Sequence, residues 1–219
     1  MLCFIPARGG SKRIPKKNIK PFITVPILWY PVNIALSCGF EVVVSTDCDE
    51  IALRAELGGA EVHSRLPSLA EDRIELEEVL YEYLRDGEYE TCCMMLPTSV
   101  FAKREDLIHA QELLHDYDLI YSIVEYEYPP QRALRLNGSL VEMVGPEHRN
   151  SQDIPKLYHD AAQFYVFDVM AFCAAWSNGG RLLEMRAHGI EYKRTEAQDI
   201  DTIEDWEIAE MKYRRIHGT

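Results

Sequence analysis

Residues 5–18 read IPARGGSKRIPKKN, and the predicted fold is arranged around this stretch. The apolar run of residues 2–5 leads into it and has the length and composition of a buried strand. We expect Pro6 to end that strand, because proline cannot donate to a sheet ladder. A loop therefore starts beyond the carboxyl end of the first predicted strand, which is where ligands bind in open α/β sheets.

This loop concentrates positive charge in an acidic chain. The formal net charge is -13, yet the loop surrounds two glycines, Gly9 and Gly10, with five cations: Arg8, Lys12, Arg13, Lys16 and Lys17. Glycines let a backbone approach a ligand closely, and cations hold phosphate oxygens. We interpret the loop as a cradle for a polyphosphate, with a solvated basic surface as the alternative. It has neither a G-x-G-x-x-G nor a G-x-x-x-x-G-K-[ST] pattern, so the dinucleotide fingerprint and the P-loop do not apply.

Size and composition limit the class of protein. A chain of 219 residues with 47% hydrophobic content can bury the core of one substantial domain, which we place at residues 1–219. The acidic balance argues against nucleic acid or an anionic membrane as a partner. Six cysteines without a C-x-x-C pair predict a reduced, cytoplasmic protein, and we expect no targeting segment or membrane span.

Strand and helix patterns alternate along most of the chain. We predict strands at 41–45, about 61–62, 92–96, 118–123, 163–167 and 190–192, and helices at 27–38, 48–57, 74–84, 103–115, from the end of the 163–167 strand to about 176, and 203–216. Pro31 is expected to delay the first helix, and Thr46 or Asp47 to cap the second. The rhythm predicts an α/β fold with a mostly parallel sheet and right-handed crossovers.

The alternation breaks between about residues 130 and 160. Two short runs, 132–136 and 140–144, flank a loop containing Asn137-Gly138, a pair that favours a type I′ hairpin turn. An isolated hairpin is only marginally stable in water. This small excursion from the sheet is therefore a candidate for a subunit contact.

Two acids stand close together near the end of the chain. Asp199 and Asp201 are two residues apart in an extended segment, so their side chains can reach one hard cation such as Mg²⁺. The alternative is that Asp201 or Thr202 caps the closing helix. Because a polyphosphate is normally handled as its magnesium complex, the basic loop favours the metal interpretation.

Both segments resemble signatures of the cytidylyltransferases that activate nonulosonic acids, and the similarity covers nearly the whole chain. Residues 44–47 (VSTD) and 96–99 (LPTS) also resemble segments of that family. The resemblance implies a nucleotide-diphospho-sugar transferase type of fold and a homodimer. It also implies a reaction of CTP with a nonulosonic acid that gives a CMP-sugar and pyrophosphate. The chain departs from the sialic-acid-activating members near the cytosine, where it has Leu96 and, within residues 73–76 (RIEL), Leu76.

The resemblance also implies roles for individual residues. Asp199 and Asp201 would hold Mg²⁺ and, with Arg8 and Lys17, form the catalytic set. The expected contacts to the nucleotide and its triphosphate come from the basic loop and the P-T-S segment: Ala7, Arg8, Gly9, Gly10, Ser11, Lys12, Lys17, Asn18 and Thr98.

The middle of the chain resembles the branch that activates pseudaminic acid, in residues 130–134 (PQRAL), 149–153 (RNSQD) and 158–165 (YHDAAQFY). Arg132 and Arg149 could pair with the sugar carboxylate, and His159 and Gln163 could bond its hydroxyl or acetamido groups. Alternatively, Asp160 only orients the His159 ring, and Gln163 only satisfies nearby backbone. A different ulosonic acid (sialic, legionaminic or octulosonate type) and an inactive nucleotide-binding regulatory homologue remain alternative functions. The sequence leaves the general base open.

Overall fold

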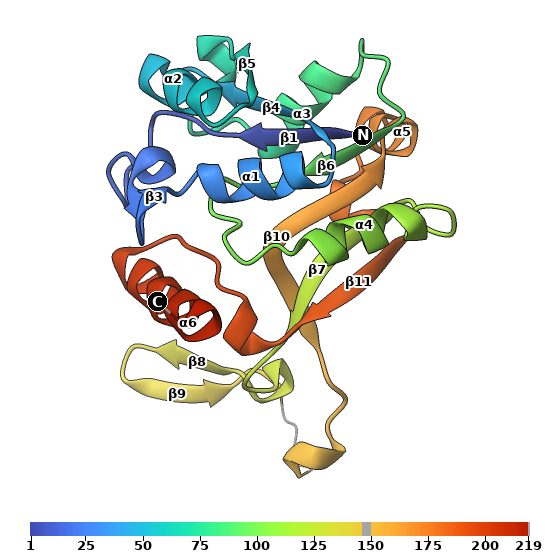
Figure 1. Cartoon of the computed structure of the whole chain (residues 1–219). Helices are drawn as coiled ribbons and strands as arrows, with labels where there is room; N and C mark the ends of the chain where they lie inside the picture. The colour runs from blue at the N-terminus through green and yellow to red at the C-terminus, as the bar shows by residue number, and fades with distance from the viewer. Residues whose placement is uncertain (146–149, 219) are drawn as a thin grey trace.

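The computed structural model describes residues 1–145 and 150–218, and a central sheet organises them (Figure 1). Its seven strands lie in the order β11 (Ala187–Tyr192), β7 (Leu119–Glu125), β10 (Tyr158–Asp168), β6 (Thr91–Met94), β1 (Leu2–Pro6), β4 (Glu41–Thr46) and β5 (Glu61–Ser64). Both pairings of β10 are antiparallel, and the other four are parallel. The predicted α/β fold with a mostly parallel sheet is confirmed.

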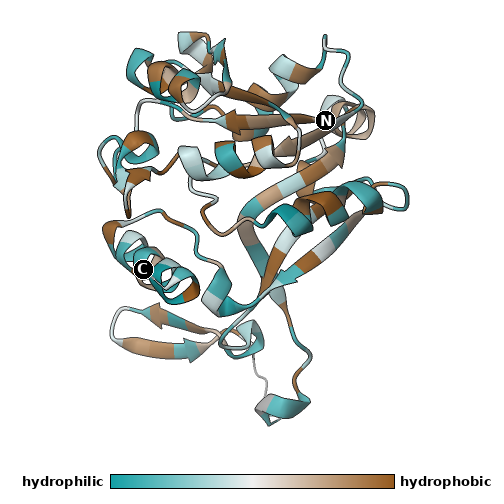
Figure 2. Ribbon diagram, in the orientation of Figure 1, coloured by the Kyte–Doolittle hydropathy of each residue, from teal (hydrophilic) through white to brown (hydrophobic). Residues whose placement is uncertain are grey.

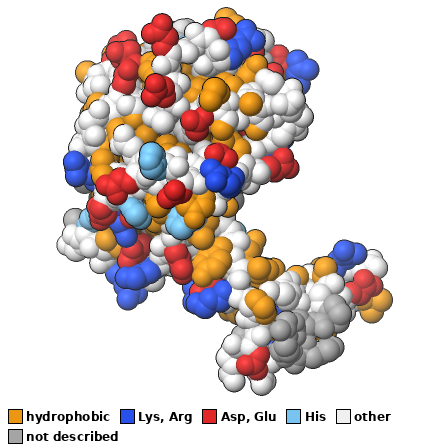
Figure 3. All heavy atoms as spheres, turned by 90° about the vertical axis from the view of Figure 1, so that its right-hand side faces the viewer, with side chains coloured by type: hydrophobic (Ala, Val, Ile, Leu, Met, Phe, Trp, Pro, Cys, Tyr) orange, Lys and Arg blue, Asp and Glu red, His pale blue; other side chains and the backbone are white. Residues whose placement is uncertain are grey.

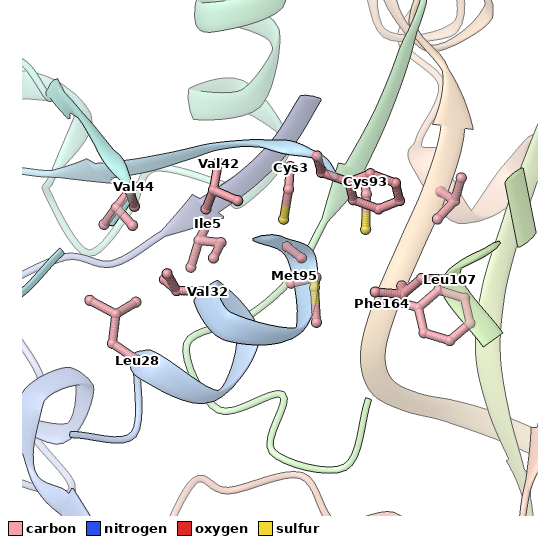
Figure 4. Packing of buried hydrophobic residues seen from close by; sticks show 14 of the residues in the cluster. Cys3, Ile5, Leu28, Val32, Val42, Val44, Cys93, Met95, Leu107 and Phe164 are labelled. Atoms are coloured by element: carbon pink, nitrogen blue, oxygen red, sulfur yellow. The ribbon is translucent and has the colours of Figure 1, made fainter. Parts of the chain in front are cut away.

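Helices cover both faces of this sheet. α1 (Trp29–Ser37), α2 (Asp49–Leu57) and α4 (Arg104–Leu113) pack on one face, and α3 (Leu76–Leu84) and α5 (Val169–Ser177) pack on the other. Along β1, Cys3 and Ile5 join the first core, while Leu2 and Phe4 join the second. Successive side chains of a strand point to opposite faces, so a strand buried on both faces reads as a continuous apolar run. Figure 4 shows the first core, and Figure 2 shows the hydrophobic central strands.

A third core binds the end of the chain to the amino-terminal loop. α6 (Ile203–His217) contributes Trp206, which packs edge-on against Phe22 at 5.5 Å between ring centroids. Phe22 belongs to a short hairpin, β2 (Pro21–Phe22) and β3 (Val25–Pro26), that follows the basic loop. Ile14, within the loop, is also buried in this core. The first and last segments of the sequence therefore lie side by side.

Two local expectations at helix starts are wrong. Pro31 does not delay α1 but lies in its first turn, where a backbone N–H has no acceptor within the helix. The residue that caps α2 is Cys48, without a side-chain hydrogen bond. The Thr46 hydroxyl instead accepts from Cys48 N at 3.2 Å, and the Asp47 carboxylate accepts from Gly9 N at 2.8 Å.

The predicted hairpin is present, with its turn one residue later than expected. β8 (Leu134–Asn137) pairs with β9 (Leu140–Met143) in a separate antiparallel sheet, and Asn137 faces Leu140 across the pair. The connecting residues are therefore Gly138 and Ser139, and of these only Gly138 has a positive φ, 62°. A type I′ turn needs a positive φ at both central residues, so the expected turn type is wrong. Among residues 1–145 and 150–218, no helix has the length and apolar character needed to cross a membrane.

Candidate active site

The basic loop lines a cavity of about 370 Å³, here called the loop cavity. Buried contacts fix the shape of the loop. Asn18 is 6% exposed and donates from Nδ2 to Arg8 O at 2.9 Å, and Lys16 adopts a left-handed conformation with φ of 54°. The residues around the cavity are Pro6, Arg8, Ser11, Lys12, Arg13, Ile14, Lys17, Asn18, Leu96, Pro97, Thr98 and Asp201.

Gly9 has a packing role in this loop. A Cβ at Gly9 would lie 2.9 Å from the Cβ of Cys48, closer than such atoms normally approach. Its N–H donates to Asp47, so it points away from the loop cavity. The Gly9 N–H is therefore bonded within the chain, and the expected contact of Gly9 with the nucleotide stays a prediction. Gly10 is exposed, with no neighbour within 4 Å of the position of a Cβ, and Ala7 is fully buried.

The acidic segment closes the loop cavity from the other end of the sequence. Lys17 Nζ donates to Ile200 O at 2.7 Å and lies 3.5 Å from Asp201 Oδ1. Arg13 Nη2 lies 2.8 Å from the same oxygen of Asp201. Asp201 is thus brought to the cations of the basic loop.

The cap of α6 does not use the Asp201 side chain. Thr202 is the N-cap, its hydroxyl accepts from Asp205 N at 3.2 Å, and the Asp205 carboxylate accepts from Thr202 N at 2.8 Å. The capping interpretation is confirmed for Thr202. It leaves the Asp201 carboxylate facing the loop cavity.

Asp199 lines a second cavity of about 370 Å³, here called the His159 cavity. Burial, together with the charge of Asp201, raises the pKa of the Asp199 carboxyl. Asp199 and Asp201 thus lie close enough to repel each other, on either side of the fully buried Ile200. The residues around this cavity are Val124, Glu125, Glu127, His159, Asp160, Ala161, Arg194, Ala197, Gln198, Asp199 and Lys212.

A bulge in β10 shapes the His159 cavity. The register of β10 against β7 shifts between Asp160 and Tyr165, and Ala162 takes a φ of 55°. Asp160 stabilises the bulge, because its carboxylate accepts from Ala162 N at 2.7 Å and from the Tyr165 hydroxyl. His159 bonds Asp160 O through Nδ1 at 2.8 Å, which fits the expected orienting contact, although the partner is the backbone and not the carboxylate.

Lys212 on α6 fixes the wall beside Asp199. Its Nζ donates to Ala197 O at 2.7 Å and to Gln198 Oε1 at 2.9 Å. Burial lowers the pKa of Lys212. This lysine therefore ties the closing helix to the segment that leads into the two aspartates.

The structure does not bring all the predicted sugar contacts to the His159 cavity. Gln163 is 1% exposed, and both ends of its amide bond backbone groups, Phe101 N at 3.0 Å and Ala161 O at 2.8 Å. Its contacts are those of the alternative interpretation, a residue that satisfies nearby backbone. Arg132 lines a separate cavity of about 1040 Å³ beside the hairpin, and Arg149 lies outside the described residues.

Sequence reasoning missed Arg65. It is 6% exposed, donates to Ser45 O at 2.9 Å, and lines a cavity of about 240 Å³, here called the Arg65 cavity. Leu69, Ile74, Leu76 and Val79 give this cavity apolar walls, and it shares Pro6 and Arg8 with the loop cavity. The available signal was a cation shortly after the predicted strand at about 61–62, at the sheet edge where ligands bind.

The described residues offer few ligands for a divalent cation. In the described part of the protein, no three His, Cys, Asp or Glu side chains gather closely enough to hold a metal ion. Mg²⁺ characteristically takes one or two carboxylates and completes its shell with water and phosphate oxygens. The neighbouring carboxylates of Asp199 and Asp201 fit that pattern, because a cation between them would relieve their mutual repulsion.

Comparisons with known proteins agree with these features. A family model described as cytidylyltransferase matches residues 2–214. A pseudaminic acid cytidylyltransferase of Campylobacter jejuni is 34% identical, covering 99% of this chain and 97% of that protein. N-acylneuraminate cytidylyltransferase A of Danio rerio is 37% identical, covering 96% of this chain and 50% of that protein.

Solved structures agree on the fold. The structure of CMP:2-keto-3-deoxy-manno-octonic acid synthetase complexed with CTP superposes with a TM-score of 0.74 at 15% identity and covers 98% of both chains. The 4-diphosphocytidyl-2C-methyl-D-erythritol synthase from Anaerococcus prevotii has a TM-score of 0.69 at 14% identity and also covers 98% of both chains. At these identities the likeness concerns the fold alone.

Proposed function

This chain belongs to the cytidylyltransferase family, and from that premise we propose that it joins CTP to pseudaminic acid, giving a CMP-sugar and pyrophosphate. The geometric observation that carries the proposal is the hydrogen bond from Lys17 Nζ to Ile200 O at 2.7 Å. It holds the basic loop and the acidic segment together, so that one nucleotide can meet both.

The three cavities suggest how the substrates would lie. The triphosphate would lie in the loop cavity and the sugar in the His159 cavity, with Asp199 and Asp201 at their junction. The anomeric oxygen of the sugar would attack the α-phosphorus, and the bond to the β-phosphate would break, so that pyrophosphate leaves with the electron pair. Such a transfer needs positioning and charge stabilisation more than a covalent nucleophile.

The chain's own cations would stabilise the charge on the phosphates. Arg8, Lys12 and Lys17 line the loop cavity, where they can hold the triphosphate and then the departing pyrophosphate. Ser11 and Thr98 line the same cavity and offer hydroxyl groups. Bound Mg²⁺ would neutralise charge that develops on the phosphates.

The base would lie in the Arg65 cavity. Its apolar walls can hold a flat pyrimidine ring, and a guanidinium can donate to the two acceptors on the edge of cytosine, O2 and N3. In this arrangement Leu76 packs against the ring, and Arg65 supplies the polar contact that Leu96 and Leu76 cannot make.

The function is tested by incubating the protein with Mg²⁺, one of the four nucleoside triphosphates and one nonulosonic acid, and measuring pyrophosphate. We expect release only with CTP, and fastest with pseudaminic acid. Preference for another ulosonic acid would contradict the substrate. Binding of CTP without sugar-dependent pyrophosphate would contradict the activity and favour a regulatory homologue.

The metal assignment needs its own test. We expect Asp199→Asn and Asp201→Asn each to lower turnover by at least about 100-fold, the scale for losing one charge-stabilising group. Both should also remove the Mg²⁺ dependence of CTP binding in calorimetry. Asp86→Asn, at an exposed aspartate paired only with Arg85 among the described residues, is the matched control. Near-normal, Mg²⁺-dependent pyrophosphate release by Asp199→Asn would disprove the assignment.

We also propose a homodimer that forms through the β8–β9 hairpin. Figure 3 shows hydrophobic side chains on the lobe below the main body, where the hairpin lies in Figure 1. Its large apolar side chains are 49% to 72% exposed: Leu134, Leu136, Leu140, Val141 and Met143. A patch of this kind marks an interaction surface in a soluble protein. Leu136→Lys should convert the dimer to a monomer in sedimentation, whereas Leu53→Lys on α2 should not; a monomeric wild type would contradict the proposal.

A cytoplasmic location is also proposed. All six cysteines are free thiols, and Cys3, Cys92 and Cys93 lie buried in the sheet. Free thiols persist in reducing compartments.

A further inference from the structure

The Asp72 carboxylate is paired with two cations of the loop cavity, Arg8 and Lys12. Asp72 Oδ1 lies 3.0 Å from Arg8 Nη1, and Asp72 Oδ2 accepts from Lys12 Nζ. These are two of the three cations to which we assign the triphosphate. Hydrogen bonding and charge from Lys12, with a smaller contribution from Arg8, lower the pKa of Asp72, so it is ionised at neutral pH.

The position of this ion pair matters as much as its charge. Arg8 lines both the loop cavity and the Arg65 cavity, and Asp72 lines the Arg65 cavity. The Arg8–Asp72 pair therefore stands at the boundary between the place of the base and the place of the phosphates. A nucleotide that spans both cavities has to pass it.

We propose that Asp72 is an autoinhibitory contact for the reaction proposed above, because it holds Arg8 and Lys12 until a polyphosphate displaces it. This inference rests on the proposed function, since it assumes that the phosphates lie in the loop cavity. A triphosphate brings several charges against one carboxylate and so displaces it readily. Asp72 therefore weakens the binding of a polyphosphate and leaves unchanged the binding of a ligand that does not use Arg8 and Lys12.

The size of the effect follows from the exposure of the pairs. The Asp72 side chain is 54% exposed, Arg8 40% and Lys12 77%. Exposed ion pairs are individually weak. The apparent affinity for a phosphate ligand falls in proportion to the fraction of protein in which Arg8 and Lys12 are not paired with Asp72. Two such pairs together should weaken phosphate binding by roughly 2- to 30-fold.

The test compares ligand affinities of wild type and Asp72→Asn by calorimetry, with inorganic pyrophosphate, CTP and cytidine as probes. Asparagine keeps the shape of the side chain and removes its charge, and thermal unfolding checks the fold. We expect Asp72→Asn to bind pyrophosphate and CTP roughly 2- to 30-fold more tightly, with the affinity for cytidine unchanged.

Glu50→Gln is the matched control. The Glu50 side chain is 48% exposed and pairs at 2.6 Å with Lys16. Lys16 is a cation of the same loop, but it does not line the loop cavity. This variant removes one negative charge from the same region without freeing a cradle cation, so its pyrophosphate affinity should stay near that of wild type.

Three results would overturn the inference. Weaker pyrophosphate binding by Asp72→Asn would mean that Asp72 positions Arg8 and Lys12 for the ligand. Equal tightening by Asp72→Asn and Glu50→Gln would mean that only net charge matters. Unchanged affinity in Asp72→Asn would likewise reject competition. If wild type binds pyrophosphate but no cytidine nucleotide, the proposed function fails, while the pyrophosphate comparison still decides the role of Asp72.

Discussion

Replacing Gln163 by methionine separates a structural role from a role in binding the sugar. Methionine is apolar and similar in length, so it fills the space while removing both polar ends of the amide. In the folded protein, Phe101 N–H then loses its acceptor at 3.0 Å, and Ala161 O loses its donor at 2.8 Å. Gln163 itself is only 1% exposed, so water cannot easily replace these partners.

The expected cost follows from these two contacts. A buried polar group left without a partner costs about 1–3 kcal/mol, and removing the amide also removes its own desolvation cost. We therefore expect Gln163→Met to lower the free energy of unfolding by about 2–4 kcal/mol. At roughly 2–4 °C per kcal/mol for a chain of this size, the melting temperature should fall by about 4–16 °C.

Thermal and urea unfolding measure this loss, and CTP and sugar kinetics are measured below the transition. Gln111→Met, at an exposed position of α4, is the control and should change the free energy of unfolding by less than about 0.5 kcal/mol. A normal melting temperature for Gln163→Met with a raised KM for the sugar alone would refute the structural reading and restore the contact predicted from the sequence.

Three further changes test other parts of the fold. Gly9→Ala should destabilise the protein by about 1–3 kcal/mol in urea unfolding, since the new Cβ would lie 2.9 Å from that of Cys48; unaltered stability would contradict the close approach. A hydrogen bond from Lys103 lowers the pKa of Glu196, so the pair stabilises the fold above the usual glutamate pKa and loses this contribution as the pH falls through the lowered value. The difference in the free energy of unfolding between wild type and Lys103→Met should therefore shrink in acid. A difference that does not change with pH would exclude this linkage. Thr202→Ala removes the side-chain cap of α6 and should cost about 1 kcal/mol in thermal unfolding; an unchanged melting temperature would contradict a stabilising role of this cap.

The sequence predicted those features that local pattern determines. The first strand is buried on both faces, so its apolar run and the loop after Pro6 are visible without coordinates. The meeting of Lys17 with residues 200–201 was also expected, because the basic loop and the two aspartates were assigned to one magnesium–polyphosphate complex.

The features that tertiary contacts determine were not predictable. Residues 163–167 read as a buried strand, but an apolar run does not record strand direction, and β10 is antiparallel to both neighbours. The sequence does not show whether a polar residue such as Gln163 faces a ligand or the backbone. Arg65 is a single cation in a short loop, and only the packing around Ser45 shows that it is buried.

The bond between Lys17 and Ile200 has a consequence for synthesis of the protein on the ribosome. The donor, Lys17, is translated 183 positions before its acceptor, Ile200. A nascent chain can form its early strands long before Asp201, which lines the loop cavity, leaves the exit tunnel. We therefore expect the loop cavity to be complete only after residue 201 has been translated.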